Sequence, residues 1–121
     1  MNKILLIEDD QFLRDIYVQM LSPIYTVDTA EDGEVAYEKI SKNTYDLILL
    51  DMFMPKLDGK QVFEQLEKNF PNKYNNKIVF MTNNDSEQTS KYFKEKNIKY
   101  FIKSTLNPEE FVSKIQEYLH K

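Results

Sequence analysis

The chain has 121 residues with 41% hydrophobic and 30% charged side chains and a net charge of -4. This composition suits one folded globular domain and argues against a dedicated nucleic-acid binder. The chain contains no cysteine and one histidine, which excludes disulfides and a thiolate nucleophile and disfavours a zinc site. The apolar run near its N-terminus is too short for a signal peptide or a membrane span. We therefore expect a cytoplasmic protein without a membrane partner.

The first part of the chain alternates short apolar runs with segments of helical periodicity. Lys3 to Ile7 is a continuous apolar run, typical of a strand buried on both faces. Apolar side chains recur at helical spacing from Gln11 to Leu21, and Pro23 ends that helix. Tyr25 to Thr29 alternates apolar and polar side chains as an edge strand does, and Gly33 to Ile40 has one apolar helical face. Strand and helix therefore alternate from the beginning.

The same alternation continues through the second part. Asp46 to Leu50 and Ile78 to Met81 read as buried strands, and Lys60 to Phe70 as the helix between them. Ser86 to Glu95 is the poorest helix because few apolar side chains anchor it, so we expect it to be the least stable element. Ile98 to Ile102 is the last predicted strand.

The final helix has both a start signal and a strong apolar face. Asn107 is a side-chain cap, and Pro108 fits the first helical turn. The apolar face comprises Phe111, Val112, Ile115, Tyr118 and Leu119. Five strands alternating with five helices predict a single α/β domain over residues 1 to 121, with a doubly wound parallel sheet covered on both faces. Such sheets bind ligands at the carboxyl ends of their strands.

Polar and charged side chains follow four of the five predicted strands. They are Glu8, Asp9 and Asp10 after the first strand, Asp51 after the third, Thr82 after the fourth and Lys103 after the fifth. Each alone has an ordinary explanation, such as a helix cap or a solvated lysine. Together they are expected to meet at one edge of the sheet, where clustered carboxylates repel one another unless a cation is present. With oxygen ligands and neither His nor Cys nearby, we expect that cation to be Mg²⁺.

Asp51 then stands where phosphoryl chemistry is feasible. An aspartate can attack phosphorus and form an aspartyl phosphate. Phosphoryl transfer needs little from a protein beyond positioning and charge stabilisation. The Lys103 ammonium and the Thr82 hydroxyl can supply these by binding phosphoryl oxygens.

Four segments together resemble the receiver domain of bacterial two-component response regulators: ILLIEDD, YDLILLDMFMPKLDG, IVFMTNN and YFIKS. The resemblance extends from about Lys3 to Leu119 and implies a chemotaxis-receiver-like, flavodoxin-like sheet of order 2-1-3-4-5. It also implies that Asp51 is the phosphoacceptor and a Mg²⁺ ligand, with Asp9 as a direct ligand, Glu8 as a ligand through water and the Phe53 backbone carbonyl as a further ligand. Thr82 and Lys103 are implied to bind the phosphoryl oxygens, and Tyr100 is implied to be the switch aromatic.

The resemblance implies a signalling phosphoacceptor rather than an enzyme, although one that assists its own phosphorylation and dephosphorylation. The phosphoryl group is expected from a sensor histidine kinase, a phosphotransfer protein or a small phosphodonor. Its charge is expected to switch the face formed by the fourth helix, fifth strand and fifth helix for an output protein or an output domain outside this sequence. Four lysines, Lys91, Lys94, Lys96 and Lys99, lie near that face. A monomer or a phosphorylation-dependent dimer is expected, with no direct contact to nucleic acid.

Two positions depart from the family pattern. Ser104 follows Lys103 where the family usually has proline, so the loop is expected to adopt a trans peptide and to hold the lysine differently. Asn83 follows the threonine where the family usually has a small residue, and we expect altered phosphorylation or hydrolysis rates. These departures leave open a degenerate receiver that acts as an interaction module without phosphorylation.

Two other classes fit less well. A haloacid-dehalogenase-type phosphohydrolase needs a second aspartate two residues after the first, and Phe53 stands there. A flavodoxin needs a loop rich in Ser, Thr and Gly after the first strand, whereas acidic residues follow Ile7 and would repel the flavin phosphate.

Overall fold

The computed structural model describes residues 2–83 and 86–120. The described residues form five strands: β1 (Lys3–Ile7), β2 (Thr26–Ala30), β3 (Leu47–Asp51), β4 (Ile78–Thr82) and β5 (Lys99–Ile102). They also form five α-helices: α1 (Gln11–Leu21), α2 (Gly33–Lys42), α3 (Gly59–Asn69), α4 (Glu87–Lys96) and α5 (Pro108–Leu119). A short 3-10 helix, η1 (Lys103–Thr105), follows β5. No helix in this part of the chain is both long and apolar enough to span a membrane.

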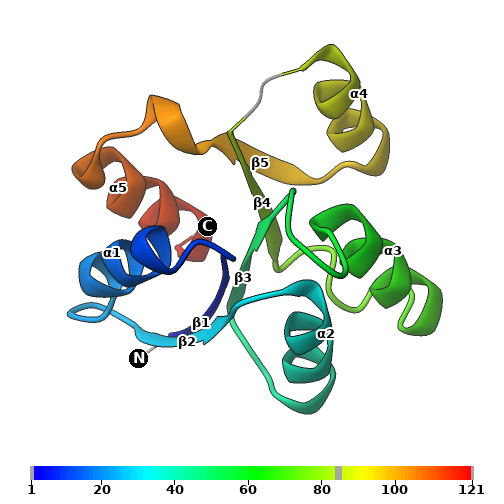
Figure 1. Ribbon diagram of the computed structural model, residues 1–121, viewed down its shortest axis with the longest axis horizontal. Coiled ribbons are helices and arrows are strands. Elements are labelled where there is room, and N and C mark those ends of the chain that lie inside the picture. Colours follow the sequence, from blue (N-terminus) through cyan, green and yellow to red (C-terminus); the bar gives the residue numbers. More distant parts are fainter. Residues whose placement is uncertain (1, 84–85, 121) are drawn as a thin grey trace.

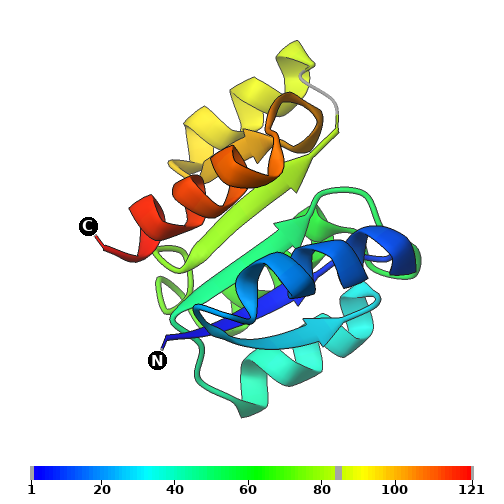
Figure 2. The ribbon, with the colours of Figure 1, turned by 90° about the vertical axis from the view of Figure 1, so that its left-hand side faces the viewer.

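The five strands form one parallel sheet in the order β2-β1-β3-β4-β5, as predicted (Figure 2). The register brings the carboxyl ends of the central strands together. Ile7 pairs with Leu50, Asp51 pairs with Met81, and Thr82 pairs with Ile102. The residues that end these strands or directly follow them therefore share one edge of the sheet.

Helices cover both faces of the sheet (Figure 1). Helices α2, α3 and α4 pack on one face, and α1 and α5 pack on the other. Strands β3 and β4 are buried along their whole length because side chains of either orientation meet a helix layer. Strands β1, β3 and β4 contribute Leu5, Ile7, Ile48, Leu50, Ile78 and Phe80 to the first layer and Ile4, Leu6, Leu47, Leu49, Val79 and Met81 to the second.

Several element boundaries differ from the sequence prediction, and β2 gives the clearest reason. Tyr25 was expected to begin this strand, but its N–H donates to the Leu21 carbonyl at 2.9 Å and so completes the turn that ends α1. Pairing with β1 begins at Thr26 and continues to Ala30. The edge position expected for this strand is confirmed. The alternation of apolar and polar side chains does not by itself show where the strand begins. Here Tyr25 belongs to the turn that ends α1 and not to the strand.

The β3–α3 connection docks on the start of α2. A methyl group at Gly33 would overlap the carbonyl oxygen and the Cβ of Leu57. Asp32 caps α2 by accepting the Val35 N–H at 2.9 Å, and its second oxygen lies 3.4 Å from the Lys56 ammonium. Close contact at Gly33 therefore holds the loop that follows Asp51.

Replacing Gly33 with alanine is expected to lower the free energy of unfolding by about 2 kcal/mol, because the added methyl overpacks this contact. Alanine usually stabilises a helix relative to glycine, so the expected sign is opposite to that of helix propensity. Urea unfolding followed by circular dichroism measures the change. The exposed neighbour Glu34 provides the control, since Glu34→Ala should change stability by less than about 0.5 kcal/mol. Unchanged or increased stability of Gly33→Ala would contradict the contact.

Candidate functional site

Three carboxylates meet at the carboxyl edge of the sheet. Glu8 and Asp9 follow β1, and Asp51 ends β3. One oxygen from each carboxylate lies within 4.8 Å of the other two. Glu8 and Asp51 are buried, whereas Asp9 is exposed. Asp10 instead caps α1 by accepting the Leu13 N–H at 3.0 Å, as its ordinary interpretation suggested.

Lys103 lies between the two buried carboxylates. Its Nζ is 2.7 Å from Glu8 Oε1 and 3.3 Å from Asp51 Oδ2, and its side chain is 4% exposed. The described residues contain no cis peptide, so the bond from Lys103 to Ser104 is trans, as expected. Helix η1 begins at Lys103. With Ser104 in place of the usual proline, Lys103 therefore still lies within reach of Asp51.

The charges of the site do not balance. Burial and the neighbouring Glu8 carboxylate raise the pKa of Asp51 to about 7, and Lys103 only partly opposes them. Partial desolvation at the mouth of the site and the Glu8 carboxylate also raise the pKa of Asp9, although its side chain is exposed. Burial alone would raise the pKa of Glu8, but hydrogen bonds with Asp51 and Lys103 hold it below its ordinary value. The pKa of Lys103 stays above its usual value because the two carboxylates outweigh burial. Three carboxylates with one ammonium favour uptake of a proton or a cation.

Phe53 and Asn83 lie at the rim of the site. They line a cavity of about 200 Å³ together with Leu13, Lys103 and the four acidic residues. The Phe53 N–H donates to Asp51 Oδ1 at 3.3 Å, and the residue as a whole is 56% exposed. Asn83 is exposed at the same opening. Both side chains therefore border the approach to Asp51.

Thr82 and Tyr100 lie on the strands beside Asp51. Thr82 is the last residue of β4 and is fully buried. It directly follows Met81, which pairs with Asp51. Tyr100 on β5 stacks on Phe93 of α4, with ring centroids 4.5 Å apart. The hydroxyls of Tyr100 and Ser90 lie 3.3 Å apart. Tyr100 thus links β5 to α4, the helix with the poorest apolar face.

Arg14 was not identified from the sequence. Its Nη1 donates to the Glu8 carbonyl at 2.8 Å and so reaches the acidic end of β1 from the first turns of α1. The available signal was the chain's one arginine placed four residues after a helix cap, which is too common a pattern to indicate a site.

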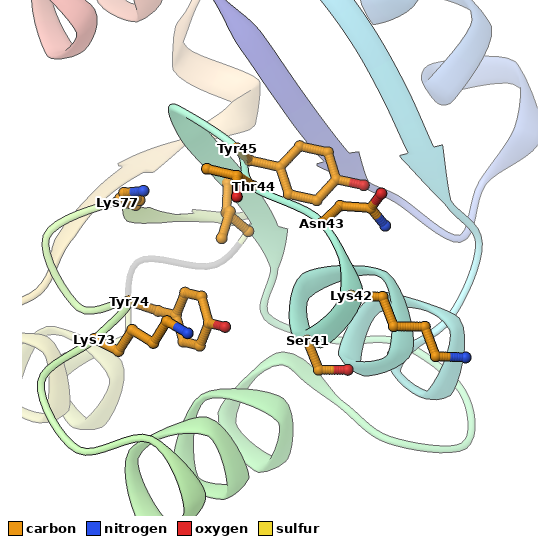
Figure 3. A pocket seen from close by; sticks show the side chains of 9 residues that line it. Ser41, Lys42, Asn43, Thr44, Tyr45, Lys73, Tyr74 and Lys77 are labelled. Carbon is orange, nitrogen blue, oxygen red and sulfur yellow. The ribbon is translucent and has the colours of Figure 1, made fainter.

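A second cavity of about 160 Å³ lies at the opposite edge of the sheet (Figure 3). Figure 3 shows Lys73 and Tyr74 opposite Ser41, with the Lys42 ammonium directed away. Lys42 pairs with Glu38 at 2.8 Å, and Lys73 lies over the Tyr74 ring. Cations beyond helix carboxyl ends are favoured by the helix dipole without any ligand. The acidic edge therefore remains the candidate functional site.

A parallel sheet of this order, with an acidic cluster and a buried lysine at its carboxyl edge, defines a flavodoxin-like domain of the receiver class. The family described as response regulator receiver domain matches residues 4–116. The chain therefore belongs to the response regulator receiver domain family.

The curated relatives that match are longer than this chain. A 70-residue stretch is 43% identical to the response regulator ArlR of Staphylococcus saprophyticus and covers 57% of this chain and 32% of that protein. Another of 66 residues is 41% identical to the gliding motility regulatory protein of Myxococcus xanthus, covering 54% of this chain and 8% of that protein. The matches thus span a third or less of these relatives.

Solved structures agree over almost the whole chain. The chemotaxis protein CheY4 of Vibrio cholerae is 26% identical, with a TM-score of 0.84 over 98% of this chain and 99% of that chain. The response regulator TrrA of Thermotoga maritima, solved in complex with Mg(2+)-BeF, is 32% identical. Its TM-score is 0.81 over 98% of this chain and 100% of that one.

Proposed function

We propose that this domain accepts a phosphoryl group on Asp51 and signals through the resulting charge. The observation that carries the proposal is the placement of the Asp51 carboxylate. It ends a fully buried strand, 3.3 Å from the Lys103 ammonium and within 4.8 Å of oxygens from Glu8 and Asp9. One Asp51 oxygen attacks phosphorus, the bond from phosphorus to the donor atom breaks, and the leaving group takes up a proton.

The acidic cluster fits Mg²⁺. Its donors are oxygens with no His or Cys, and its excess negative charge suits a hard divalent cation. We assign Asp9, Asp51 and the Phe53 backbone carbonyl as direct ligands and Glu8 as a ligand through water. When bound, the ion offsets the repulsion between the carboxylates and an incoming phosphoryl group. The TrrA complex with Mg(2+)-BeF supports this assignment by similarity.

Lys103 and Thr82 complete the proposed site. Phosphorylation adds close to two negative charges and three acceptor oxygens. The buried Lys103 ammonium can bind one oxygen as a point charge, and the Thr82 hydroxyl can donate to another. These residues hold the phosphoryl group while Asp51 reacts. The domain thereby assists its own phosphorylation and dephosphorylation without acting on a separate substrate as an enzyme does.

The proposed output is a change at the face formed by α4, β5 and α5. Movement of Thr82 toward the phosphoryl group opens space for Tyr100, whose stacking on Phe93 connects it to α4. Only two residues of α4, Thr89 and Phe93, are buried, so a few kcal/mol can bias its position. Lys91, Lys94, Lys96 and Lys99 lie near this face and are the proposed contacts for a partner; Lys91 also lies 4.0 Å from Glu95.

The proposed partners follow from the family. A sensor histidine kinase or phosphotransfer protein in the cytoplasm supplies the phosphoryl group. An output protein, or an output domain outside this sequence, reads the altered face. The domain acts as a monomer or as a dimer formed on phosphorylation. The trans peptide at Ser104 still leaves Lys103 beside Asp51, which favours an active receiver over a degenerate interaction module.

The direct test is labelling by ³²P-acetyl phosphate with Mg²⁺. Wild-type protein is expected to acquire an acid-stable, alkali-labile label, and Asp51→Asn is expected to lose it because the nucleophilic oxygen is replaced by an amide nitrogen. Asp15→Asn, an exposed position on α1, is the control and should label normally. Undiminished labelling of Asp51→Asn would refute the assignment, and an unlabelled wild-type protein would favour the degenerate receiver.

A further inference from the structure

Arg14 turns from α1 back to the end of β1. Its Nη1 donates to the carbonyl oxygen of Glu8 at 2.8 Å and lies 3.5 Å from that of Asp9. The ion pairs found among the described residues do not include Arg14. Its guanidinium is therefore committed to the main chain of the two acidic residues rather than to a carboxylate.

The Glu8 carbonyl lies just beyond the ordered ladder of β1. The Glu8 N–H still bonds to Ala30 at 3.1 Å, but strand pairing ends at Ile7. A sheltered carbonyl without a donor is costly, and the peptide that bears it is free to rotate. Arg14 supplies the donor at this point. The same contact restrains the peptide that joins Glu8 to Asp9.

We infer that Arg14 is a positioning residue for cation binding at the acidic cluster. It contacts neither the cation nor the phosphoryl group and acts through the main chain of Glu8 and Asp9. Holding these peptides fixes where the exposed Asp9 carboxylate lies relative to Asp51. The inference rests on the proposed function, because it takes the cluster to be a Mg²⁺ site.

Two roles for Arg14 predict opposite results. If Arg14 acted only as a positive charge, its removal would strengthen cation binding, because less positive charge would oppose Mg²⁺. If Arg14 positions the peptides, its removal weakens cation binding, because the ligands must then be ordered when the ion binds. The direction of the affinity change therefore distinguishes positioning from a simple charge effect.

The experiment is a Mg²⁺ titration of Arg14→Met, followed by NMR shifts of the Glu8, Asp9 and Asp51 amides. Methionine keeps much of the packing volume but provides no donor. We expect the Kd for Mg²⁺ to rise by about 10-fold, the usual effect of losing a hydrogen bond that orients a ligand. Arg14→Lys keeps a charge and a donor and is expected to remain within about 3-fold of wild type.

Lys42→Met is the matched control, since it removes one positive charge from an exposed pair at the carboxyl end of α2. Its Mg²⁺ affinity should equal that of wild type. Arg14→Ala, which also lacks a donor, provides a second variant should Arg14→Met fold poorly by circular dichroism, and weaker Mg²⁺ binding is expected for it too. Unchanged or tighter binding in a folded Arg14 variant that lacks the donor would overturn this inference alone. Absence of Mg²⁺-dependent shifts at the cluster in wild-type protein would overturn both it and the proposed metal site.

Discussion

Replacing Lys103 with methionine is expected to lower the free energy of unfolding by about 3 kcal/mol near pH 8. The lysine is 4% exposed and pairs with the buried carboxylates of Glu8 and Asp51 at 2.7 and 3.3 Å. Without it, both carboxylates remain buried beside Asp9 with no cation. The loss should be smaller near pH 5, because the carboxylates can then take up protons. Urea unfolding at both pH values, in Mg²⁺-free buffer, measures it.

A double variant separates lost packing from unpaired charge. Glu8→Gln removes one of the carboxylates that Lys103 neutralises, so Glu8→Gln with Lys103→Met should recover much of the lost stability. Lys42→Met breaks an exposed pair and should change stability by less than about 0.5 kcal/mol. If Lys103→Met is as stable as wild type at both pH values, the ion pairs with Glu8 and Asp51 do not hold this edge together.

The fold was predictable because the strands and helices of each layer have a characteristic spacing of apolar residues in the sequence. The central strands are buried on both faces, so β3 and β4 are apolar up to the polar residue that ends each of them. Alternation of strand and helix then leaves few topologies. The order of the sheet came from the family resemblance, since periodicity does not rank neighbouring strands. The boundary at Tyr25 was wrong because a helix-ending turn and an edge strand compete for the same residue.

The site residues that end a strand or directly follow one could be predicted from the sequence. Glu8 and Lys103 are 95 residues apart in the chain, yet the rule for parallel sheets places both at one edge. Side chains that reach across from helices or loops follow no such rule. Arg14 bonds to a main-chain carbonyl, and the Lys56 ammonium reaches Asp32 from a loop. Neither contact leaves a spacing pattern, so they required three-dimensional structure.

Replacing Asp51 with asparagine is expected to stabilise the fold in Mg²⁺-free buffer. Burial and Glu8 raise the pKa of Asp51 from 3.8 to about 7. The folded state therefore binds more protons than the unfolded state between these values, and wild-type stability falls as pH rises through this window. Linkage sets an upper limit of about 4 kcal/mol, and we expect about 2 because Lys103 and Glu8 respond to the same charge. Asparagine removes this penalty, so the gain should appear near pH 8 and vanish near pH 4.

Urea unfolding of both proteins between about pH 4 and pH 8 tests this expectation. Asp15→Asn, at an exposed position, should show no comparable gain. A less stable Asp51→Asn near pH 8 would contradict it, since Asp51 would then stabilise the ionised site. Mg²⁺ provides the link to function, because it should stabilise wild type more than Asp51→Asn. The Asp51 carboxylate thus lowers the stability of the fold in the absence of Mg²⁺. The same carboxylate is proposed to bind the cation and then to accept the phosphoryl group.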